Sequence, residues 1–396
     1  MRHHRIVAAA TAVFAAFGLT GAAHAQDSVK IGLMLPYKGI YASLAEGIDN
    51  GWKLALEQWG NKAGGKTIEI IRADDENDPK GAIQKANKLV KSDNVDILSG
   101  VVSSGVGVAM AKFAETEKKP FVLTFAVADQ ITGSMCNPYL ARASFSANAY
   151  ESGAGAYWAK QGKKTAVTIG PDYAAGHAMI AGFKKGFEAG GGKVVLELWS
   201  AFQKTKDWGP LLTKAKEANA DMIYSFYGGA ESIQVVKQHA AFGLKKSLPL
   251  MGDQWLYDEA LFDAMGDAAL GARYVATATP DAPGEGSKKF AAAFTKKFGS
   301  EPDVNAAIGY ENAVAILMAL DKAKGDVKDG AAFIKTLQTV EFDAPRGKFR
   351  FNKDNNAQLD QIYLVEIVKG ADGKLTRKYV ETFPGGQDLP GCKMGG

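Results

Sequence analysis

Two adjacent serines, Ser103 and Ser104, are the residues of this chain best placed to do chemistry. They follow an apolar run at 95–99 that is typical of a buried strand, and a helical pattern begins after them. Hydroxyl groups and free backbone N–H groups at a strand-to-helix turn can bind an anion, helped by the positive end of the helix dipole. The two serines therefore indicate an anion site, although serine is also an ordinary residue for capping a helix.

Sequence motifs for catalysis are incomplete. Neither serine lies in the G-x-S-x-G turn of a hydrolase, and residues 105–110 form a broken dinucleotide motif with Met110 in place of the third glycine. The acidic residues at 74–78 lack the glycine and glutamate of a calcium loop, and His177 and His239 are isolated from the cysteines in sequence. We expect no enzymatic activity, no cofactor and no metal. A secreted α/β hydrolase that pairs one serine with His177 is the enzymatic alternative.

Short apolar runs alternate with longer amphipathic runs along most of the chain. The apolar runs predict strands at 29–35, 68–73, 95–99, 121–124, 166–169, 194–198, 222–226, 248–251 and 274–276. Each run is apolar throughout, as in strands covered by helices on both faces. The amphipathic runs predict helices, one of which begins after Asp78 and Pro79, a cap followed by proline at the first helical position. The alternation predicts an α/β fold with parallel sheets.

The alternation restarts near residues 143–147, which indicates two similar α/β halves. The later part of the chain predicts helices at 287–298, 304–323 and 330–338, then strands at 348–351, 362–368 and 375–382. If these segments return to both halves, several crossing strands join the halves rather than one tether.

Ligands of open parallel sheets bind beyond the carboxyl ends of the strands. That rule selects the loops 36–45, 101–106, 125–132, 171–176, 227–230 and 252–257. The loops and strand ends are rich in aromatic residues, namely Tyr37, Tyr41, Phe125, Tyr173, Phe226, Tyr227, Trp255 and Tyr257. Some will be ordinary packing, but so many at strand ends predict a pocket for a flat or apolar ligand.

The first 25 residues have the pattern of an export signal. Arg2 and Arg5 precede an apolar stretch at 6–19, and residues 23–25 supply a small-x-small cleavage site. The stretch is too short to span a bilayer, so we expect cleavage after Ala25 and no insertion in a membrane. The formal net charge of the whole chain is +4, and no basic run interleaved with aromatics indicates nucleic-acid binding.

Cys136 and Cys392 both lie after the expected cleavage site. An even pair in an oxidising compartment favours a disulfide, which would tie the C-terminal tail back to the body of the protein. Two unpaired buried thiols are the alternative.

Several short motifs occur in an order that resembles a known family. They are Val29-Lys30-Ile31-Gly32-Leu33, Asn50-Gly51, Asp74-Asp75 with Asp78-Pro79, Val102-Ser103-Ser104, Ala128-Asp129, Gly228-Gly229 and Leu250-Met251-Gly252. The chain resembles a type I periplasmic solute-binding protein of an ABC importer, in the leucine/isoleucine/valine-binding branch. The resemblance implies two lobes, each with a mostly parallel sheet flanked by helices, joined by three crossover strands. It places 26–143 with 277–345 in the N-terminal lobe, and 144–276 with 346–396 in the C-terminal lobe.

The resemblance also implies roles for single residues. Ser103 matches a serine that binds a ligand carboxylate, Tyr173 matches an aromatic residue that closes over the ligand, and Val127 stands where relatives often have a threonine. Gln254 falls where amino-acid binders place a glutamate for the ligand ammonium. The predicted ligand contacts are Tyr41, Ser103, Ser104, Ala126, Val127, Tyr173, Tyr227, Gly228, Gln254 and Trp255.

A neutral amide at position 254 suits a ligand without positive charge, because a buried ammonium without a carboxylate partner is costly. We therefore expect a small carboxylate, an aromatic or 2-oxo acid, bound in the interlobe cleft. A branched-chain or other apolar amino acid held through Asp253 is the alternative. The resemblance implies a periplasmic monomer that delivers its solute to an ABC permease in the inner membrane, while a sensory role would use the same fold.

Overall fold

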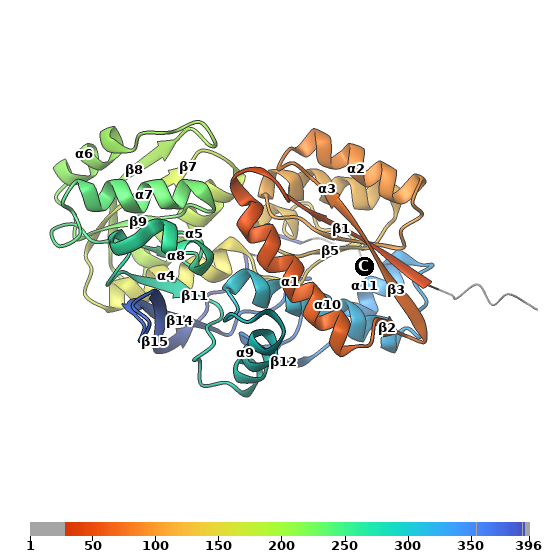
Figure 1. The fold of residues 1–396 in the computed structure, drawn as a ribbon. Helices are drawn as coiled ribbons and strands as arrows, with labels where there is room; N and C mark the ends of the chain where they lie inside the picture. The colour runs from red at the N-terminus through yellow and green to blue at the C-terminus, as the bar shows by residue number, and fades with distance from the viewer. Residues whose placement is uncertain (1–27, 354, 390, 393–396) are drawn as a thin grey trace, which may run out of the picture.

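The computed structural model describes residues 28–353, 355–389 and 391–392, and the expected export signal lies outside them. Its two large sheets stand side by side with helices on their faces (Figure 1). Both sheets are mostly parallel, which confirms the predicted α/β fold class.

The first sheet has the strand order β2-β3-β1-β4-β5-β6, and only β2 is antiparallel to its neighbour. Its strands are β1 (Ser28–Leu35), β2 (Lys62–Ala63), β3 (Lys66–Asp74), β4 (Ile97–Gly100), β5 (Phe121–Leu123) and β6 (Leu140–Arg142). Helices α1 (Ala42–Gln58), α2 (Pro79–Lys91) and α3 (Ser104–Glu117) connect them. The predicted cap of α2 is confirmed, because the Asp78 carboxylate accepts from the Gly81 N–H at 2.7 Å.

The second sheet has the order β15-β14-β11-β10-β9-β7-β8. Its strands are β7 (Thr165–Pro171), β8 (Lys193–Ser200), β9 (Met222–Ser225), β10 (Leu250–Asp253), β11 (Arg273–Ala276), β14 (Gln361–Lys369) and β15 (Leu375–Pro384). The helices of this lobe are α4 (Ala147–Lys160), α5 (Ala174–Ala189), α6 (Gly209–Glu217), α7 (Ala230–Ala241) and α8 (Phe262–Met265). The last two strands run antiparallel to their neighbours.

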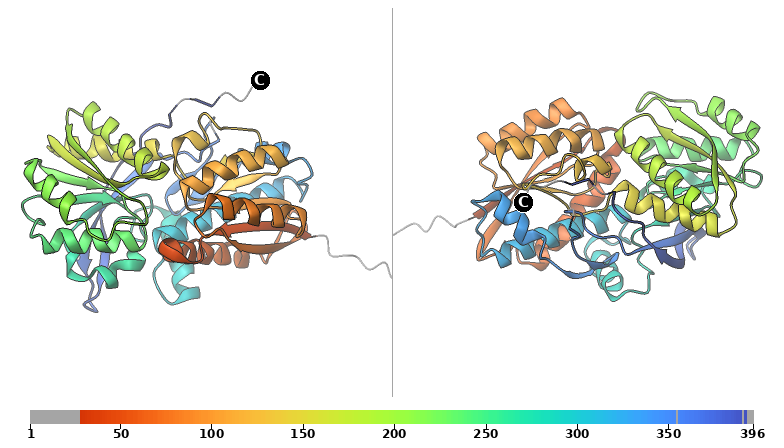
Figure 2. Two further views of the ribbon diagram at one scale, coloured as in Figure 1. Left: turned by 90° about the horizontal axis from the view of Figure 1, so that it is seen from above. Right: turned by 180° about the vertical axis from the view of Figure 1, so that it is seen from behind.

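The remaining segments lie between β11 and β14 in the chain. They are α9 (Glu285–Phe298), α10 (Val304–Lys322), α11 (Gly330–Leu337), β12 (Phe342–Ala344) and β13 (Gly347–Phe349). Helix α10 returns to the first lobe and packs along α1 (Figure 1), and Figure 2 shows the two lobes from above and from behind. The approach is so close that a Cβ at Gly51 would lie 2.1 Å from the Ala306 carbonyl oxygen. We call the first sheet with α1–α3 and α10 the N-lobe, and the second sheet with α4–α8 the C-lobe.

The chain passes between the lobes after β6, after β11 and again before β14. The late segments therefore return to both lobes, as the sequence pattern allowed. Strands β2, β6 and β12 were not predicted, because each is only two or three residues long and lacks a sustained apolar run.

The C-terminal tail is held against both lobes. After β15, Gly386 N–H donates to the Ala149 carbonyl at 2.7 Å, and the Asn148 side chain donates to the Gln387 carbonyl at 2.5 Å. Cys392 then forms a disulfide with Cys136, with 5.5 Å between their Cα atoms. The predicted disulfide is confirmed.

Candidate functional site

A narrow cavity lies where the carboxyl ends of strands from both sheets meet. The space between its walls, including solvent at its mouth, is about 290 Å³, and little of it admits a water molecule while the lobes are in this position. Its lining comes from the segments that follow β1, β4 and β5 in the N-lobe and β7, β9 and β10 in the C-lobe: Tyr41, Leu44, Val102, Ser104, Phe125, Val127, Tyr173, Ala175, Phe226, Gly228 and Trp255. None of these described lining residues carries a charge. The cavity therefore has the place that open parallel sheets give to a ligand, and its walls are largely apolar.

Ser104 places a hydroxyl group in the cavity wall. It is the first residue of α3, is almost fully buried, and lines the cavity. Its Oγ accepts from the N–H groups of Val127 and Ala128, both at 3.1 Å. With both lone pairs of the oxygen occupied in this way, the hydroxyl proton remains as a donor. Ser104 can therefore donate to an acceptor placed at the N-terminus of α3.

Aromatic side chains form the walls of the cavity. The Trp255 ring lies 4.7 Å from the Phe125 ring and 6.0 Å from the Phe226 ring, measured between centroids, and meets Phe226 edge to face. The Trp255 indole N–H is buried and has no acceptor in the part of the chain that the structure describes. Since a buried donor without an acceptor is costly, the indole is a second group that an acceptor on a ligand could satisfy.

The two lobes meet at Tyr41 and Tyr173. Their hydroxyl oxygens are 2.9 Å apart, and the Tyr173 ring stacks on Phe202 with 3.8 Å between centroids. Burial raises the pKa of the Tyr41 hydroxyl well above its usual range, so the pair is uncharged at neutral pH. This bridge closes one side of the cavity across the lobe boundary.

Gly229 allows a second close contact between the lobes. Its φ is +62°, and a Cβ there would lie 1.8 Å from the Ile40 carbonyl oxygen of the N-lobe. A larger residue at this position would force the lobes apart. The neighbouring Gly228 lines the cavity, as the strand-end position implied.

Of the residues predicted to contact a ligand, Tyr41, Ser104, Val127, Tyr173, Gly228 and Trp255 come together around the cavity. The other predicted residues are buried beside it without lining it. Ser103 is the N-cap residue of α3, and Ala126 packs in the N-lobe core. Tyr227 points into the C-lobe, where its hydroxyl donates to Ser200 Oγ at 2.8 Å. A ligand contact by any of these residues stays a prediction.

Gln254 and Asp253 are both turned into the protein. The Gln254 carbonyl oxygen accepts from the backbone N–H and the hydroxyl of Thr277, at 2.7 and 3.0 Å. Asp253 Oδ1 accepts from the N–H groups of Trp255 and Leu256, at 2.8 and 2.9 Å. Burial raises the pKa of Asp253 to about 7. Neither side chain lines the cavity, so neither supplies a carboxylate or amide to its surface.

Several lining and neighbouring residues were not among the predicted contacts. Leu44, Val102 and Ala175 are small or aliphatic residues without a sequence signal that separates them from the core. Phe125 and Phe226 belong to the aromatic strand ends already noted. Phe202 follows β8, and the strand-end rule applied to that strand would have found it.

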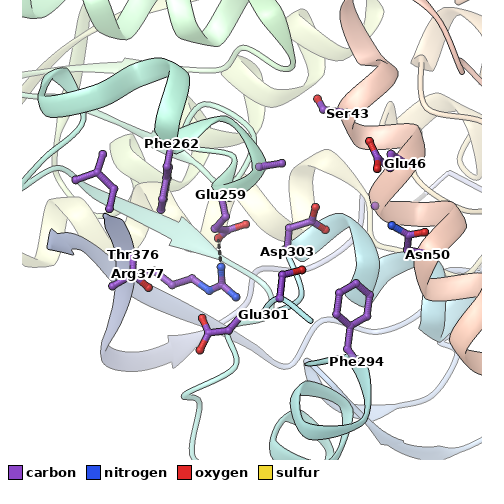
Figure 3. Close-up of a pocket in the computed structure, with 14 residues that line it drawn as sticks. Ser43, Glu46, Asn50, Glu259, Phe262, Phe294, Glu301, Asp303, Thr376 and Arg377 are labelled. Atoms are coloured by element: carbon purple, nitrogen blue, oxygen red, sulfur yellow. Dashed lines mark ion pairs between the residues drawn. The ribbon is translucent and has the colours of Figure 1, made fainter. Parts of the chain in front are cut away.

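A wider pocket lies elsewhere on the lobe boundary, between α1 and the segments around Glu259 and Arg377 (Figure 3). Glu46, Glu301 and Asp303 also line it, and Arg377 is already paired with Glu259 at 3.8 Å. An excess of carboxylates repels an anionic ligand, so this pocket does not suit the predicted carboxylate.

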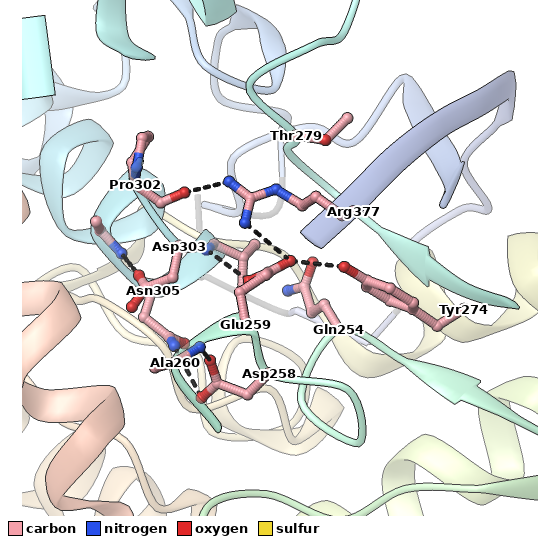
Figure 4. A network of polar contacts seen from close by, with 12 residues as sticks. Gln254, Asp258, Glu259, Ala260, Tyr274, Thr279, Pro302, Asp303, Asn305 and Arg377 are labelled. Carbon is pink, nitrogen blue, oxygen red and sulfur yellow. Dashed lines mark hydrogen bonds and ion pairs between the residues drawn. The ribbon is translucent and has the colours of Figure 1, made fainter. Parts of the chain in front are cut away.

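The polar groups beside this pocket connect α10 to the C-lobe (Figure 4). Glu259 accepts from the Tyr274 hydroxyl at 2.7 Å and from the Val304 N–H at 3.3 Å, and Arg377 donates to the Pro302 carbonyl. Asp303 caps α10 by accepting from the Ala306 N–H at 2.6 Å. The network is a structural connection between the lobes.

The acidic residues at 74–78 form a turn that leads into α2. Asp75 is completely buried, and its Oδ1 accepts from the Asn77 N–H at 2.9 Å. Among the described residues, no group of three His, Cys, Asp or Glu side chains is arranged to hold a metal ion. No helix in the described ranges is long and apolar enough to cross a membrane.

Comparison with known proteins agrees with this geometry. The family described as periplasmic binding protein matches residues 28–374. The chain is 26% identical over 390 residues to a Brucella melitensis protein named Leu/Ile/Val-binding protein homolog 6. The aligned region covers 97% of this chain and 98% of that protein.

Two similar solved structures contain aromatic acids. A solute binding protein of an ABC transporter from R. palustris, in complex with benzoate, is 33% identical with a TM-score of 0.85, covering 93% of this chain and 100% of that chain. A solute binding protein of an ABC transporter from Rhodopseudomonas palustris BisB5, in complex with 3,4-dihydroxy benzoic acid, is 32% identical with a TM-score of 0.84. The match covers 91% of this chain and 99% of that chain.

Proposed function

The chain belongs to the periplasmic binding protein family as an ABC-transporter solute-binding protein, and we propose that its solute is a small aromatic carboxylate. The observation that carries this proposal is the cavity itself, which has aromatic walls, uncharged lining residues and donors without acceptors. Proteins of this kind bind solutes for transport and are not enzymes.

The donors at the cavity match a carboxylate. The Ser104 hydroxyl has its proton left to donate, and the Trp255 indole N–H lacks an acceptor among the described residues. The positive end of the α3 dipole lies at Ser104 and favours a negative group there. Phe125, Phe226 and Trp255 provide apolar faces for a planar ring.

An amino-acid ligand fits the same cavity less well. Its ammonium group needs a carboxylate or several acceptors once it is buried. The described cavity lining contains no Asp or Glu, and Asp253 lies outside it with Oδ1 accepting from the backbone N–H groups of Trp255 and Leu256. The names of the Brucella relatives make leucine the proper competitor in a test.

The test is titration calorimetry of the purified protein with benzoate, 3,4-dihydroxybenzoate and leucine. We expect both aromatic acids to bind and leucine to give no heat at the same concentrations. Tight binding of leucine without a response to either acid would refute the proposal.

We further propose that the protein acts as a periplasmic monomer that delivers the acid to an ABC permease. Cleavage after Ala25 would release it, and mass spectrometry of the protein from the periplasmic fraction would identify Gln26 as its first residue. A mature protein that retains the first 25 residues would contradict this.

A further inference from the structure

Arg142 is a fully buried arginine that forms no ion pair with the described residues, although Asp129 and Asp388 are its nearest charged neighbours. It ends strand β6 at the edge of the N-lobe sheet. Every other arginine in the described ranges forms an ion pair with a carboxylate, namely Arg72, Arg273, Arg346, Arg350 and Arg377. Arg142 forms none within those ranges, and its Nε has no partner there. A buried charge without an ion-pair partner is costly, so its surroundings require an explanation.

The guanidinium binds the back of the loop that faces the cavity. Its Nη1 donates to the Val127 carbonyl at 3.0 Å and to the Phe145 carbonyl at 3.3 Å, and its Nη2 donates to the Ala128 carbonyl at 2.6 Å. All three acceptors are neutral. The guanidinium N–H groups are therefore directed at the loop 125–128, where their acceptors are carbonyl oxygens and not carboxylates.

One peptide unit connects Arg142 to the cavity. The carbonyl of Val127 accepts from Arg142, and the N–H of the same peptide unit, that of Ala128, donates to Ser104 Oγ at 3.1 Å. The Ser104 hydroxyl then has its proton left for the cavity. Hydrogen bonds arranged in such a chain polarise one another, so a cation at one end strengthens the donor at the other.

We propose that Arg142 is a positioning residue that makes the cavity selective for anions, by polarising the Ser104 hydroxyl through the Val127–Ala128 peptide. This inference rests on the proposed function and specifies how a carboxylate is distinguished from a neutral ligand of the same shape. The bound carboxylate would add a negative charge on the cavity side of this peptide, besides those of Asp129 and Asp388.

The experiment compares benzoate with benzamide, its neutral counterpart, in wild-type protein and in Arg142→Gln. We expect the variant to lose on the order of ten-fold or more in affinity for benzoate, while its affinity for benzamide changes by less than about three-fold. Equal losses for both ligands would show that Arg142 only supports the loop, and would overturn the inference while leaving the proposed function intact. A wild-type protein that binds neither benzoate nor 3,4-dihydroxybenzoate would overturn both.

Arg142→Lys provides a second test, which can be carried out even if Arg142→Gln does not fold. A buried lysine loses its proton at a lower pH than arginine, so benzoate affinity should fall as the pH rises from 6 to 10 in this variant. The charged groups nearest to position 142 are Asp129 and Asp388. Both are carboxylates and raise the pKa of a neighbouring cation. Benzamide affinity should not follow this pH dependence, and a flat benzoate profile in the folded variant would contradict the inference.

Discussion

Ser104→Ala tests the cavity most directly, because it removes one oxygen with two known partners. In the wild type, Oγ accepts from the Val127 and Ala128 N–H groups, both at 3.1 Å, and its proton is available to a ligand. The variant loses a hydrogen bond to a charged group, which contributes about 1.5–3 kcal/mol. At about 1.4 kcal/mol per factor of ten, benzoate affinity should fall about 10- to 150-fold.

The same variant should also be less stable without ligand. Two buried N–H groups lose their acceptor, and each unsatisfied donor costs about 1–3 kcal/mol. Because water or a shift of the loop can relieve part of this, we expect a total loss of about 2–4 kcal/mol in the free energy of unfolding, measured by urea denaturation.

Ser103→Ala is the matched control. Ser103 is also buried at the start of α3, but its hydroxyl makes no hydrogen bond with the described residues and does not line the cavity. We expect calorimetry to show a larger loss of benzoate affinity for Ser104→Ala than for Ser103→Ala. If Ser103→Ala abolished binding and Ser104→Ala bound like the wild type, the assignment of the donor to Ser104 would be wrong.

Three other perturbations follow from the structure. Replacing Cys136 and Cys392 together by serine removes a crosslink across 256 residues of sequence and should lower the free energy of unfolding by up to about 4–5 kcal/mol in urea; a loss below about 1 kcal/mol would contradict the chain-entropy estimate. Burial raises the pKa of Asp75 from 3.8 to about 7, so the folded protein favours the protonated carboxyl group. The stability that this preference contributes is fully present below pH 3.8 and is lost as the pH rises through 7. Urea denaturation at pH 5 and 8 should show that Asp75→Asn loses less stability over this interval than the wild type, by on the order of 3 kcal/mol, and parallel pH profiles would refute this. Tyr173→Phe keeps the aromatic ring but removes the 2.9 Å contact with Tyr41, so benzoate affinity should fall about 3- to 10-fold by calorimetry, whereas unchanged affinity would show that the contact does not stabilise the closed lobes.

The long buried strands could be predicted because their side chains are apolar on both faces. Strand β6 was missed because it is three residues long and ends in Arg142, a charged residue whose burial depends on carbonyl groups of the loop after β5. A sequence pattern cannot show such acceptors. The antiparallel edge formed by β14 and β15 likewise depends on tertiary pairing, although both strands were expected.

The place of the cavity could be predicted better than the direction of its side chains. The strand-end rule selected the loops that line the cavity, since βαβ connections bring the carboxyl ends of strands together. It could not distinguish Ser104 from Ser103, or Gly228 from Tyr227, because neighbouring residues point in different directions once the backbone is fixed. The two backbone donors of Asp253 likewise depend on the folded turn after β10, and its alternative role stays a prediction.

The contact between Tyr41 and Tyr173 has a consequence for the kinetics of solute exchange. While these hydroxyls touch and Gly229 lies against Ile40, the lobes are in direct contact at this rim of the cavity. A solute must then wait for separation of the lobes, so the observed rate of binding should level off at high solute concentration instead of rising in proportion to it. The plateau in a stopped-flow trace would give the opening rate of the protein, independent of which acid is supplied.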